Sequence, residues 1–229
     1  MDMTALMHVL QFTDSTFPVG TFSFSNGLET AAYEKMVHDA PTLEAFARAA
    51  SEQAAYTDGV AALYALKAAK MADYEAVLDA DYSLEAAKMN AEARLMLARM
   101  GKKLAELGVK LFPCDKLIAR WLDDIRAKRT PGTYPVAQGL VFFAAGLSEP
   151  ELFCSHQYGV INMILGAALR MVRVSHIDTQ LILQKLTAES LTLYEAVKAL
   201  PLSQMRAFVP EMDICASLHE KGKMRMFMN

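Results

Sequence analysis

The chain has 229 residues, which suffices for one large domain or two small ones with a full hydrophobic core. Hydrophobic residues make up 53% of it, glycine (11) and proline (8) are few, and the formal net charge is -3 without a basic block. This composition favours helices and argues against nucleic-acid binding.

The cysteines Cys114, Cys154 and Cys215 are odd in number and far apart. They are typical of reduced thiols in a cytosolic protein, not of a disulfide framework or a zinc site. The N-terminus shows no signal-peptide pattern. The longest uncharged apolar run, residues 136–147, is far shorter than the ~20 residues of a membrane span. We therefore expect a cytoplasmic protein that does not cross a membrane.

The first expected helix covers residues 3–12, with Leu6, Val9 and Leu10 on one side. The least helical stretch of the chain follows at residues 13–29, T-D-S-T-F-P-V-G-T-F-S-F-S-N-G-L-E. We expect this stretch to form a loop of defined conformation that leads into the N-terminus of a helix. Its aromatic rings either plug the core or are held ready for a partner, and the residues alone leave both alternatives open.

A second helix is expected over residues 27–36, with Asn26 as its cap and Glu29 as the capping-box partner. Thr42 is expected to cap the next helix, over residues 43–72, which Gly59 bends or divides. Ser83 is expected to cap a helix that runs to about residue 107.

A stripe of apolar residues at helical spacing predicts one buried side for that last helix and its extension. Its members are Met89, Ala93, Met96, Met100, Leu104, Leu107 and Leu111. A methionine stripe of this kind is more typical of core packing than of a metal site.

Residues 135–147 are nearly all apolar, which predicts a helix buried on every side. Ser148 and Glu151 form a predicted capping box that opens a helix to about residue 174. Two glycine pairs, each seven residues apart, share a helix face and predict a close crossing of these two helices. The pairs are Gly139 with Gly146 and Gly159 with Gly166.

Two further helices are expected over residues 178–200 and 211–221. No repeat or linker interrupts the chain. The sequence therefore predicts an all-α fold, a single compact domain over residues 1–229 with about nine or ten helices and a flexible C-terminal tail at about 222–229.

Common catalytic motifs are absent: the sequence contains no G-x-x-x-x-G-K-[ST], G-x-S-x-G or H-E-x-x-H. Cys154 and His156 are close in sequence, but residues two apart point to different sides of a helix. The methionines of the tail favour an adaptable contact surface over a copper site. We expect no catalytic residue, no metal site and no directly bound cofactor.

Three segments carry a recognisable pattern: L-Q-F-T-D-S-T-F-P-V-G-T-F-S-F-S-N-G-L-E (10–29), G-T-Y-P-V-A-Q-G-L (132–140) and H-E-K-G-K-M-R-M-F (219–227). With these segments the chain resembles the urease accessory protein UreF family, over nearly its whole length. Two departures concern the first segment. Thr21 stands where a small residue is common, and Phe24 stands where histidine is frequent, which argues against a nickel contact by this loop.

The resemblance implies an all-α fold and a non-catalytic role in nickel insertion during urease maturation. It implies binding to UreD (also called UreH), recruitment of the GTPase UreG to apo-urease, and a homodimer in that complex. Nickel and GTP would be handled by the partners. The partner-binding residues carried over by position are Pro18, Gly20, Phe22, Ser23, Ser25, Gly27, Leu28, Glu29, His219, Glu220, Arg225 and Phe227.

The alternative from the residues is an all-α small-molecule-binding protein or enzyme with an apolar pocket between helices. That function requires a cavity on which polar groups converge.

Overall fold

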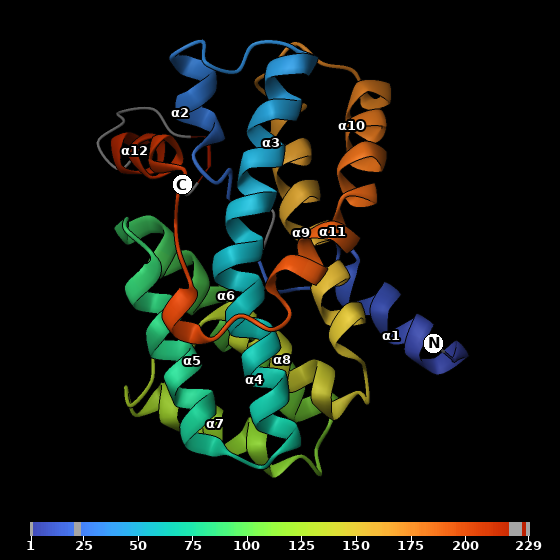
Figure 1. Cartoon of the computed structure of the whole chain (residues 1–229), viewed down its shortest axis with the longest axis vertical. Coiled ribbons are helices and arrows are strands. Elements are labelled where there is room, and N and C mark those ends of the chain that lie inside the picture. Colours follow the sequence, from blue (N-terminus) through green and yellow to red (C-terminus); the bar gives the residue numbers. More distant parts are fainter. Residues whose placement is uncertain (1, 21–23, 220–225, 228–229) are drawn as a thin grey trace.

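The computed structural model describes residues 2–20, 24–219 and 226–227. Within these residues every regular element is helical, which confirms the expected all-α fold (Figure 1). In chain order the elements are α1 (Met3–Thr13), α2 (Leu28–Tyr33), α3 (Ala40–Ala54), the π-helical segment η2 (Ala55–Gly59), α4 (Val60–Lys70), α5 (Tyr74–Ala87), α6 (Ala91–Leu111), α7 (Lys116–Arg126), α8 (Tyr134–Ala144), α9 (Glu149–Ala168), α10 (His176–Ala188), α11 (Ser190–Val197), the 3-10 segment η3 (Leu202–Gln204) and α12 (Pro210–His219). None of these helices combines the length and the apolar composition that a bilayer crossing requires.

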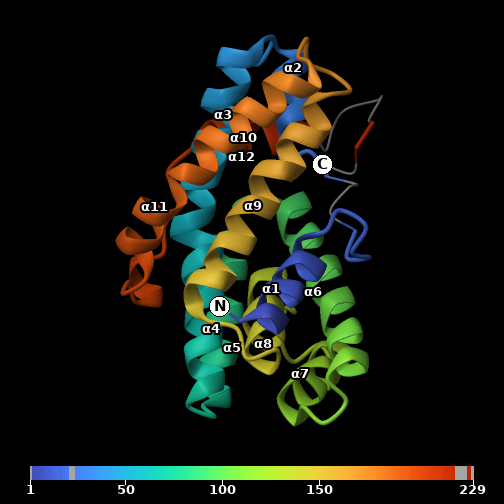
Figure 2. The ribbon, with the colours of Figure 1, turned by 90° about the vertical axis from the view of Figure 1, so that its right-hand side faces the viewer.

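A long helical rod of α3, η2 and α4 runs through the molecule, and α9 lies along it (Figures 1 and 2). Around α4, the helices α5, α6, α7 and α8 form the lower half in Figure 1. Around α3, the helices α2, α10 and α12 form the upper half, while α1 projects from the side. Each half has its own cluster of buried apolar side chains.

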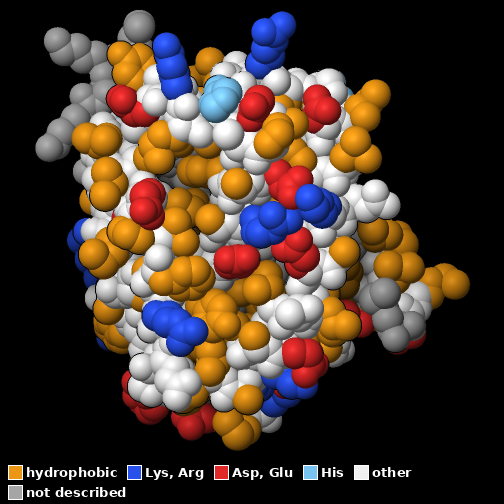
Figure 3. All heavy atoms as spheres, turned by 45° about the horizontal axis from the view of Figure 1, so that its top comes forward, with side chains coloured by type: hydrophobic (Ala, Val, Ile, Leu, Met, Phe, Trp, Pro, Cys, Tyr) orange, Lys and Arg blue, Asp and Glu red, His pale blue; other side chains and the backbone are white. Residues whose placement is uncertain are grey.

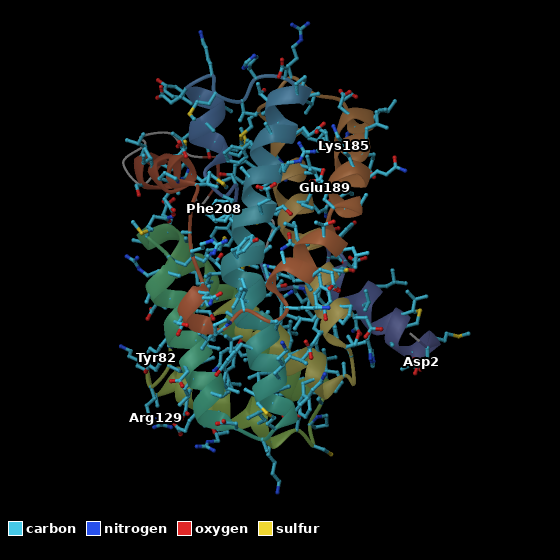
Figure 4. All side chains as sticks on the ribbon, in the orientation of Figure 1. Asp2, Tyr82, Arg129, Lys185, Glu189 and Phe208 are labelled. Carbon is cyan, nitrogen blue, oxygen red and sulfur yellow. The ribbon has the colours of Figure 1, made fainter. Side chains whose placement is uncertain are left out.

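The lower cluster contains the fully buried rings of Trp121, Phe142 and Phe153. The upper cluster is built from Leu28 and Leu43 against α9. A surface ion-pair network also ties α10 to α3, because Lys185 and Glu189 lie on the side of α10 that faces that helix (Figure 4). Lys185 Nζ lies 2.5 Å from Glu44 Oε1, and Arg48 Nη2 lies 2.8 Å from Glu189 Oε1.

Gly59 does not divide the rod: it ends the π-helical segment with helical backbone angles, and α4 follows directly. A Cβ atom at this position would lie 2.9 Å from the ring of Phe153, so α9 can approach only a glycine here. The helix begins earlier than expected, at Ala40. Asp39 is its N-cap, and Thr42 supplies the other half of a capping box.

The prediction that Ser83 caps a helix is wrong. Ser83 lies inside α5, and α6 begins only at Ala91 with Asn90 as its cap. The Asn90 side chain accepts a hydrogen bond from Ala93 N at 2.7 Å. As a consequence Met89 lies outside both helices and is 73% exposed.

The middle of the apolar stripe is buried on α6 as predicted, at Ala93, Met96, Met100 and Leu104. The predicted burial of α8 is confirmed, as is the capping box of Ser148 and Glu151 at the start of α9. The expected helix over residues 178–200 is divided into α10 and α11 at Glu189.

The predicted crossing of two glycine faces is wrong. A Cβ atom at Gly139 would lie 2.7 Å from the carbonyl oxygen of Ala62, so this glycine packs against α4, not α9. Gly146 lies beyond the end of α8 with φ +71. At Gly159 and Gly166 no described atom outside the adjoining turns of α9 lies within 4 Å of the Cβ position. The second pair therefore faces open space.

Candidate partner-binding site

The N-terminal loop, helix α12 and the described end of the chain meet at the upper end of the fold (Figure 1). Gly27 makes the approach of α2 to α12 possible. Its φ is +82, and a Cβ atom would lie 3.1 Å from Met212 O and 3.3 Å from Cys215 Cβ. A side chain here would be strained by the backbone and crowded by α12.

Glu29 joins the N-terminal segment to the C-terminal one. Its Oε1 accepts a hydrogen bond from the backbone N–H of Met226 at 2.8 Å, and its Oε2 accepts one from Phe227 at 3.0 Å. The same Oε2 lies 3.1 Å from Nε2 of His219. We call Glu29, Glu92, His219, Met226 and Phe227 the terminal clasp.

His219 links the clasp to helix α6. The residue is only 4% exposed, and its Nδ1 lies 3.0 Å from Oε2 of Glu92, which is in the first turn of α6. Both ring nitrogens therefore face a carboxylate, and His219 connects α12 to α2 and to α6 at the same time.

Phe227 belongs to the upper core. It is 6% exposed and lies in the same apolar cluster as Leu28. The guanidinium carbon of Arg170 on α9 lies 5.3 Å from the centre of its ring, within the range of a cation–π interaction. Of the expected flexible tail, the structure describes residues 226–227, and these are held in the clasp.

The predicted capping box of Asn26 and Glu29 is wrong. Asn26 has φ +55 and Gly27 has φ +82, so the chain turns sharply before α2. The cap position falls on Gly27, which has no side chain to contribute. The carboxylate of Glu29 is used in the terminal clasp instead.

The described rings of the N-terminal loop pack against the core. Of the two alternatives, core packing and partner contact, the structure therefore shows core packing for Phe17 and Phe24. Phe24 is 5% exposed, and the ring of Phe17 lies 5.6 Å from that of Phe12. The start of the loop is shaped by Asp14, which accepts hydrogen bonds from the side chain and the backbone of Thr16 at 2.5 and 2.6 Å. These bonds lower the pKa of Asp14.

The candidate residues from the sequence therefore fall into three groups. Pro18 and Gly20 are exposed. Glu29 is partly buried, and the buried members are Ser25, Gly27, Leu28, His219 and Phe227. The remaining four, Phe22, Ser23, Glu220 and Arg225, lie outside the described residues.

Sequence reasoning missed Glu92 and Arg170 as part of this site. Glu92 lies 127 residues from His219 in the chain. Both residues have the appearance of ordinary surface charges on helices, and no local pattern distinguishes them.

Helix α1 carries an exposed apolar face next to the loop. Its members are Met3 (82% exposed), Leu6 (41%), Met7 (60%) and Leu10 (54%). The inward face consists of Ala5, Val9 and Phe12, so the expected grouping of Leu6 and Leu10 with Val9 is wrong. Asp2 caps the outer end of the helix by accepting a hydrogen bond from Ala5 N at 2.7 Å (Figure 4).

Among the described residues no group of three or more His, Cys, Asp or Glu side chains is arranged to hold a metal ion. Cys154 and His156 diverge as expected for residues two apart on a helix, since Cys154 is exposed and His156 is buried.

Comparison with known proteins gives the family. The family model UreF matches residues 37–187 of this chain. The chain belongs to the UreF family. The matched range contains Glu92 and Arg170 but neither end of the terminal clasp.

Relatives within the UreF family align over both ends. "Urease accessory protein UreF 2" of Brucella suis (strain ATCC 23445 / NCTC 10510) is 45% identical over 227 residues, which cover 99% of this chain and 93% of the relative. "Urease accessory protein UreF" of Yersinia pestis (strain Pestoides F) is 41% identical over 229 residues, which cover 100% of both chains. The chain is thus a urease accessory protein of the UreF family by its sequence.

Proposed function

We propose that this chain is a non-catalytic scaffold of urease maturation. In this function it binds UreD (UreH), recruits the GTPase UreG to apo-urease and so supports nickel insertion. Membership in the UreF family supports a role in urease maturation. Two observations carry the proposal: the exposed apolar face of α1, and the terminal clasp that joins the start of α2 to residues 226–227 on another side of the molecule (Figure 1).

The α1 face is suited to receive a protein partner. Four large apolar side chains are exposed on one short helix, and contiguous exposed apolar surface of this kind marks interaction sites. The upper end of the molecule also shows hydrophobic side chains over much of its surface, with charged groups interspersed (Figure 3). We assign the α1 face and the exposed loop residues Pro18 and Gly20 to UreD binding.

The buried candidate residues act indirectly in this proposal. Glu29 and His219 set the position of the C-terminal segment, and exposed residues next to them make contact with the partner. Met226 is one such residue, because it is 60% exposed while its backbone N–H is bound to Glu29. Phe22, Ser23, Glu220 and Arg225 remain assigned to partner binding by their position in the sequence.

Nickel and GTP are assigned to the partner complex, with no cofactor bound directly by this chain. The sequence has no P-loop that could hold a nucleotide. A scaffold acts on a GTPase by preferring one of its states, and it shifts the equilibrium only by its difference in affinity for the two.

A homodimer in the complex is also part of the proposal. Helices α10 and α11 expose Ile177 (72%), Leu181 (59%) and Leu191 (69%), which offers an apolar surface to a second copy. We assign this surface to self-association.

Light scattering of the full chain alone, with UreD, and with UreD and UreG together tests the proposal. We expect stepwise mass increases, and no GTP hydrolysis by the purified chain alone. Absence of a complex with UreD, or turnover of a compound without any partner, would overturn the scaffold function.

A further inference from the structure

A cavity of about 360 Å³ lies between α9, α6 and the π-helical segment, and the N-terminal loop contributes to its lining. Its volume is within the range of small-molecule sites. The lining includes residues that the terminal clasp and the α1 face do not use. The scaffold function therefore leaves this cavity unexplained.

One face of α9 forms a wall of the cavity. Ser155, Gly159, Asn162 and Gly166 line it at spacings of four, three and four residues, which places them on one side of the helix. No described atom outside the adjoining turns of α9 lies within 4 Å of the Cβ position of either glycine. Burial decreases along this wall, from Ser155 (4% exposed) to Gly166, which is exposed. The glycine spacing thus marks a hollow that opens toward Gly166.

The deep end of the wall presents two polar atoms for which the described part of the chain offers no hydrogen-bond partner. They are Oγ of Ser155 and Nε2 of His156, in residues that are 4% and 5% exposed. A buried polar atom without a hydrogen bond is unfavourable, and a ligand that pairs with both atoms would remove that penalty.

A hydrogen-bond network determines which role His156 plays. Gln138 Nε2 donates to Tyr134 OH at 3.2 Å, which turns its Oε1 toward Nδ1 of His156 at 2.8 Å. This network assigns the proton to Nδ1, so Nε2 is an acceptor. Burial lowers the pKa of His156, more than the nearby charge of Asp58 raises it, and the ring is neutral.

Two of the charged groups in the lining, Asp58 and Lys88, compensate each other. Asp58, on the π-helical segment, forms an ion pair with Lys88 and accepts a hydrogen bond from Thr57 Oγ1 at 2.7 Å. Burial alone would raise the pKa of Asp58, but Lys88 and these hydrogen bonds hold it below its usual value. Both groups are therefore ionised and the pair has no net charge, so it favours neither an anionic nor a cationic ligand.

The π-helical segment that carries Asp58 is a second feature of the cavity, because π-helical turns occur often at functional sites.

The remaining walls are apolar and adaptable. Met96, Leu97 and Met100 of α6 face Met163 of α9 across the cavity lining. Methionine side chains adjust to ligands of irregular shape. The apolar walls and the polar end together define the ligand chemistry.

We infer that this cavity binds a neutral small molecule with an apolar body and a hydroxyl head, which donates a hydrogen bond to Nε2 of His156 and accepts one from Oγ of Ser155. The inference goes beyond the scaffold function and does not depend on it. A molecule of this class would occupy the hollow along α9 with its head at the deep end.

Phenol and toluene provide a matched pair of probes of similar size and shape, since a methyl group in toluene replaces the hydroxyl group of phenol. The full chain is labelled with ¹³C at its methionine methyl groups and titrated with each probe by NMR. We expect saturable shifts of the Met96, Met100 and Met163 signals. Phenol should bind about fivefold more tightly than toluene, because its two hydrogen bonds outweigh the more favourable burial of the methyl group. Equal affinities, or no saturable shift with either probe, would overturn the inference.

Gly159→Leu tests the location. The new side chain would extend into the hollow, and leucine is a better helix former than glycine, so the melting temperature should not fall. We expect this variant to lose phenol binding. Ala86→Leu places the same side chain on the exposed surface of α5 and should bind phenol as the unaltered chain does. Phenol binding retained by Gly159→Leu would place the probe elsewhere and overturn the assignment.

Discussion

At the scale of single residues, Glu29 has a larger structural role than its position suggests. Its carboxylate accepts hydrogen bonds from two backbone N–H groups near the C-terminus and contacts His219, which lies 190 residues away in the chain. A residue predicted to contact a partner thus organises the segment that carries other candidate contacts.

Replacing Glu29 with alanine removes the acceptor for Met226 and Phe227 and leaves His219 with one carboxylate. We expect the free energy of unfolding to fall by about 1–3 kcal/mol, because the buried His219 ring and the partly buried N–H of Phe227 lose a partner. Urea denaturation followed by circular dichroism measures this change. Glu34→Ala is the matched control, since Glu34 is exposed just after α2, and its effect should stay within about 0.5 kcal/mol. Equal losses in the two variants would contradict the clasp.

His156 makes stability depend on pH. The pKa of His156 in the folded chain is lowered from 6.5. Below pH 6.5 the unfolded chain therefore binds more protons at this residue than the folded chain does. Stability from this group is present above pH 6.5 and is lost as the pH falls toward the folded pKa.

The difference in free energy of unfolding between His156→Gln and the unaltered chain should therefore be larger at about pH 7.5 than at about pH 5.5. Urea unfolding at both values measures the two differences in free energy. If the difference in free energy of unfolding between His156→Gln and the unaltered chain is the same at both pH values, His156 does not titrate differently in the folded and unfolded states.

At the scale of elements, the second signature segment has a packing role. Asp81 of α5 accepts hydrogen bonds from Thr130 Oγ1, Gly132 N and the backbone and side chain of Thr133, at 2.5–2.8 Å. The turn so held lies directly on α6, where a Cβ atom at Gly101 would be 2.0 Å from Gly132 O. This contact sets the spacing between α6 and the start of α8.

Gly101→Ala should lower the free energy of unfolding by about 3 kcal/mol or more, because the new methyl group collides with rigid backbone. Thermal unfolding measures the loss. Gly166→Ala, also inside a helix, meets no described atom outside the adjoining turns of α9 within 4 Å and should leave stability unchanged or raise it by up to about 1 kcal/mol. A similar melting temperature for both variants would refute the close approach of the turn to α6.

Helix α1 offers the second test at this scale. Leu10→Glu puts a charge on the exposed apolar face and should weaken UreD binding about tenfold or more, since a buried leucine contributes roughly 1.5–3 kcal/mol. Calorimetric titration measures the affinity. Gln11→Glu adds the same charge at the neighbouring exposed position, about 100° around the helix, and should have a smaller effect. Equal affinities of Leu10→Glu and the unaltered chain would exclude the α1 face as the docking surface.

At the scale of the whole molecule, a continuous rod connects two apolar clusters. The rod passes from α3 through the π-helical segment into α4, and the upper cluster includes Phe227 from the far end of the chain. The described C-terminal residues are therefore part of the upper core, and loss of the tail affects both stability and binding.

Deletion of residues 223–229 should weaken UreD binding and leave helicity intact, because the deleted residues lie beyond α12. It should also lower the melting temperature, because the ring of Phe227 leaves the upper core. Calorimetry and circular dichroism measure the two effects. Deletion of Met228 and Asn229 alone retains the clasp and serves as the control. Unchanged affinity after the longer deletion would contradict a binding role for the tail.

The sequence by itself determined the features that depend on local patterns. The helical class follows from composition, the start of α9 from the Ser148 and Glu151 capping box, and the buried α8 from its apolar run. The UreF family was also readable from the residues. Each of these signals lies within a few residues of what it predicts.

The tertiary structure alone decided the rest. It showed that Gly159 and Gly166 face a hollow rather than another helix, and that Glu29 binds the C-terminal segment rather than capping α2. The physical reason is distance along the chain. A hydrogen bond between residues 190 positions apart depends on how the elements pack, as does a cavity between helices. The residues near each partner in the sequence do not indicate such features.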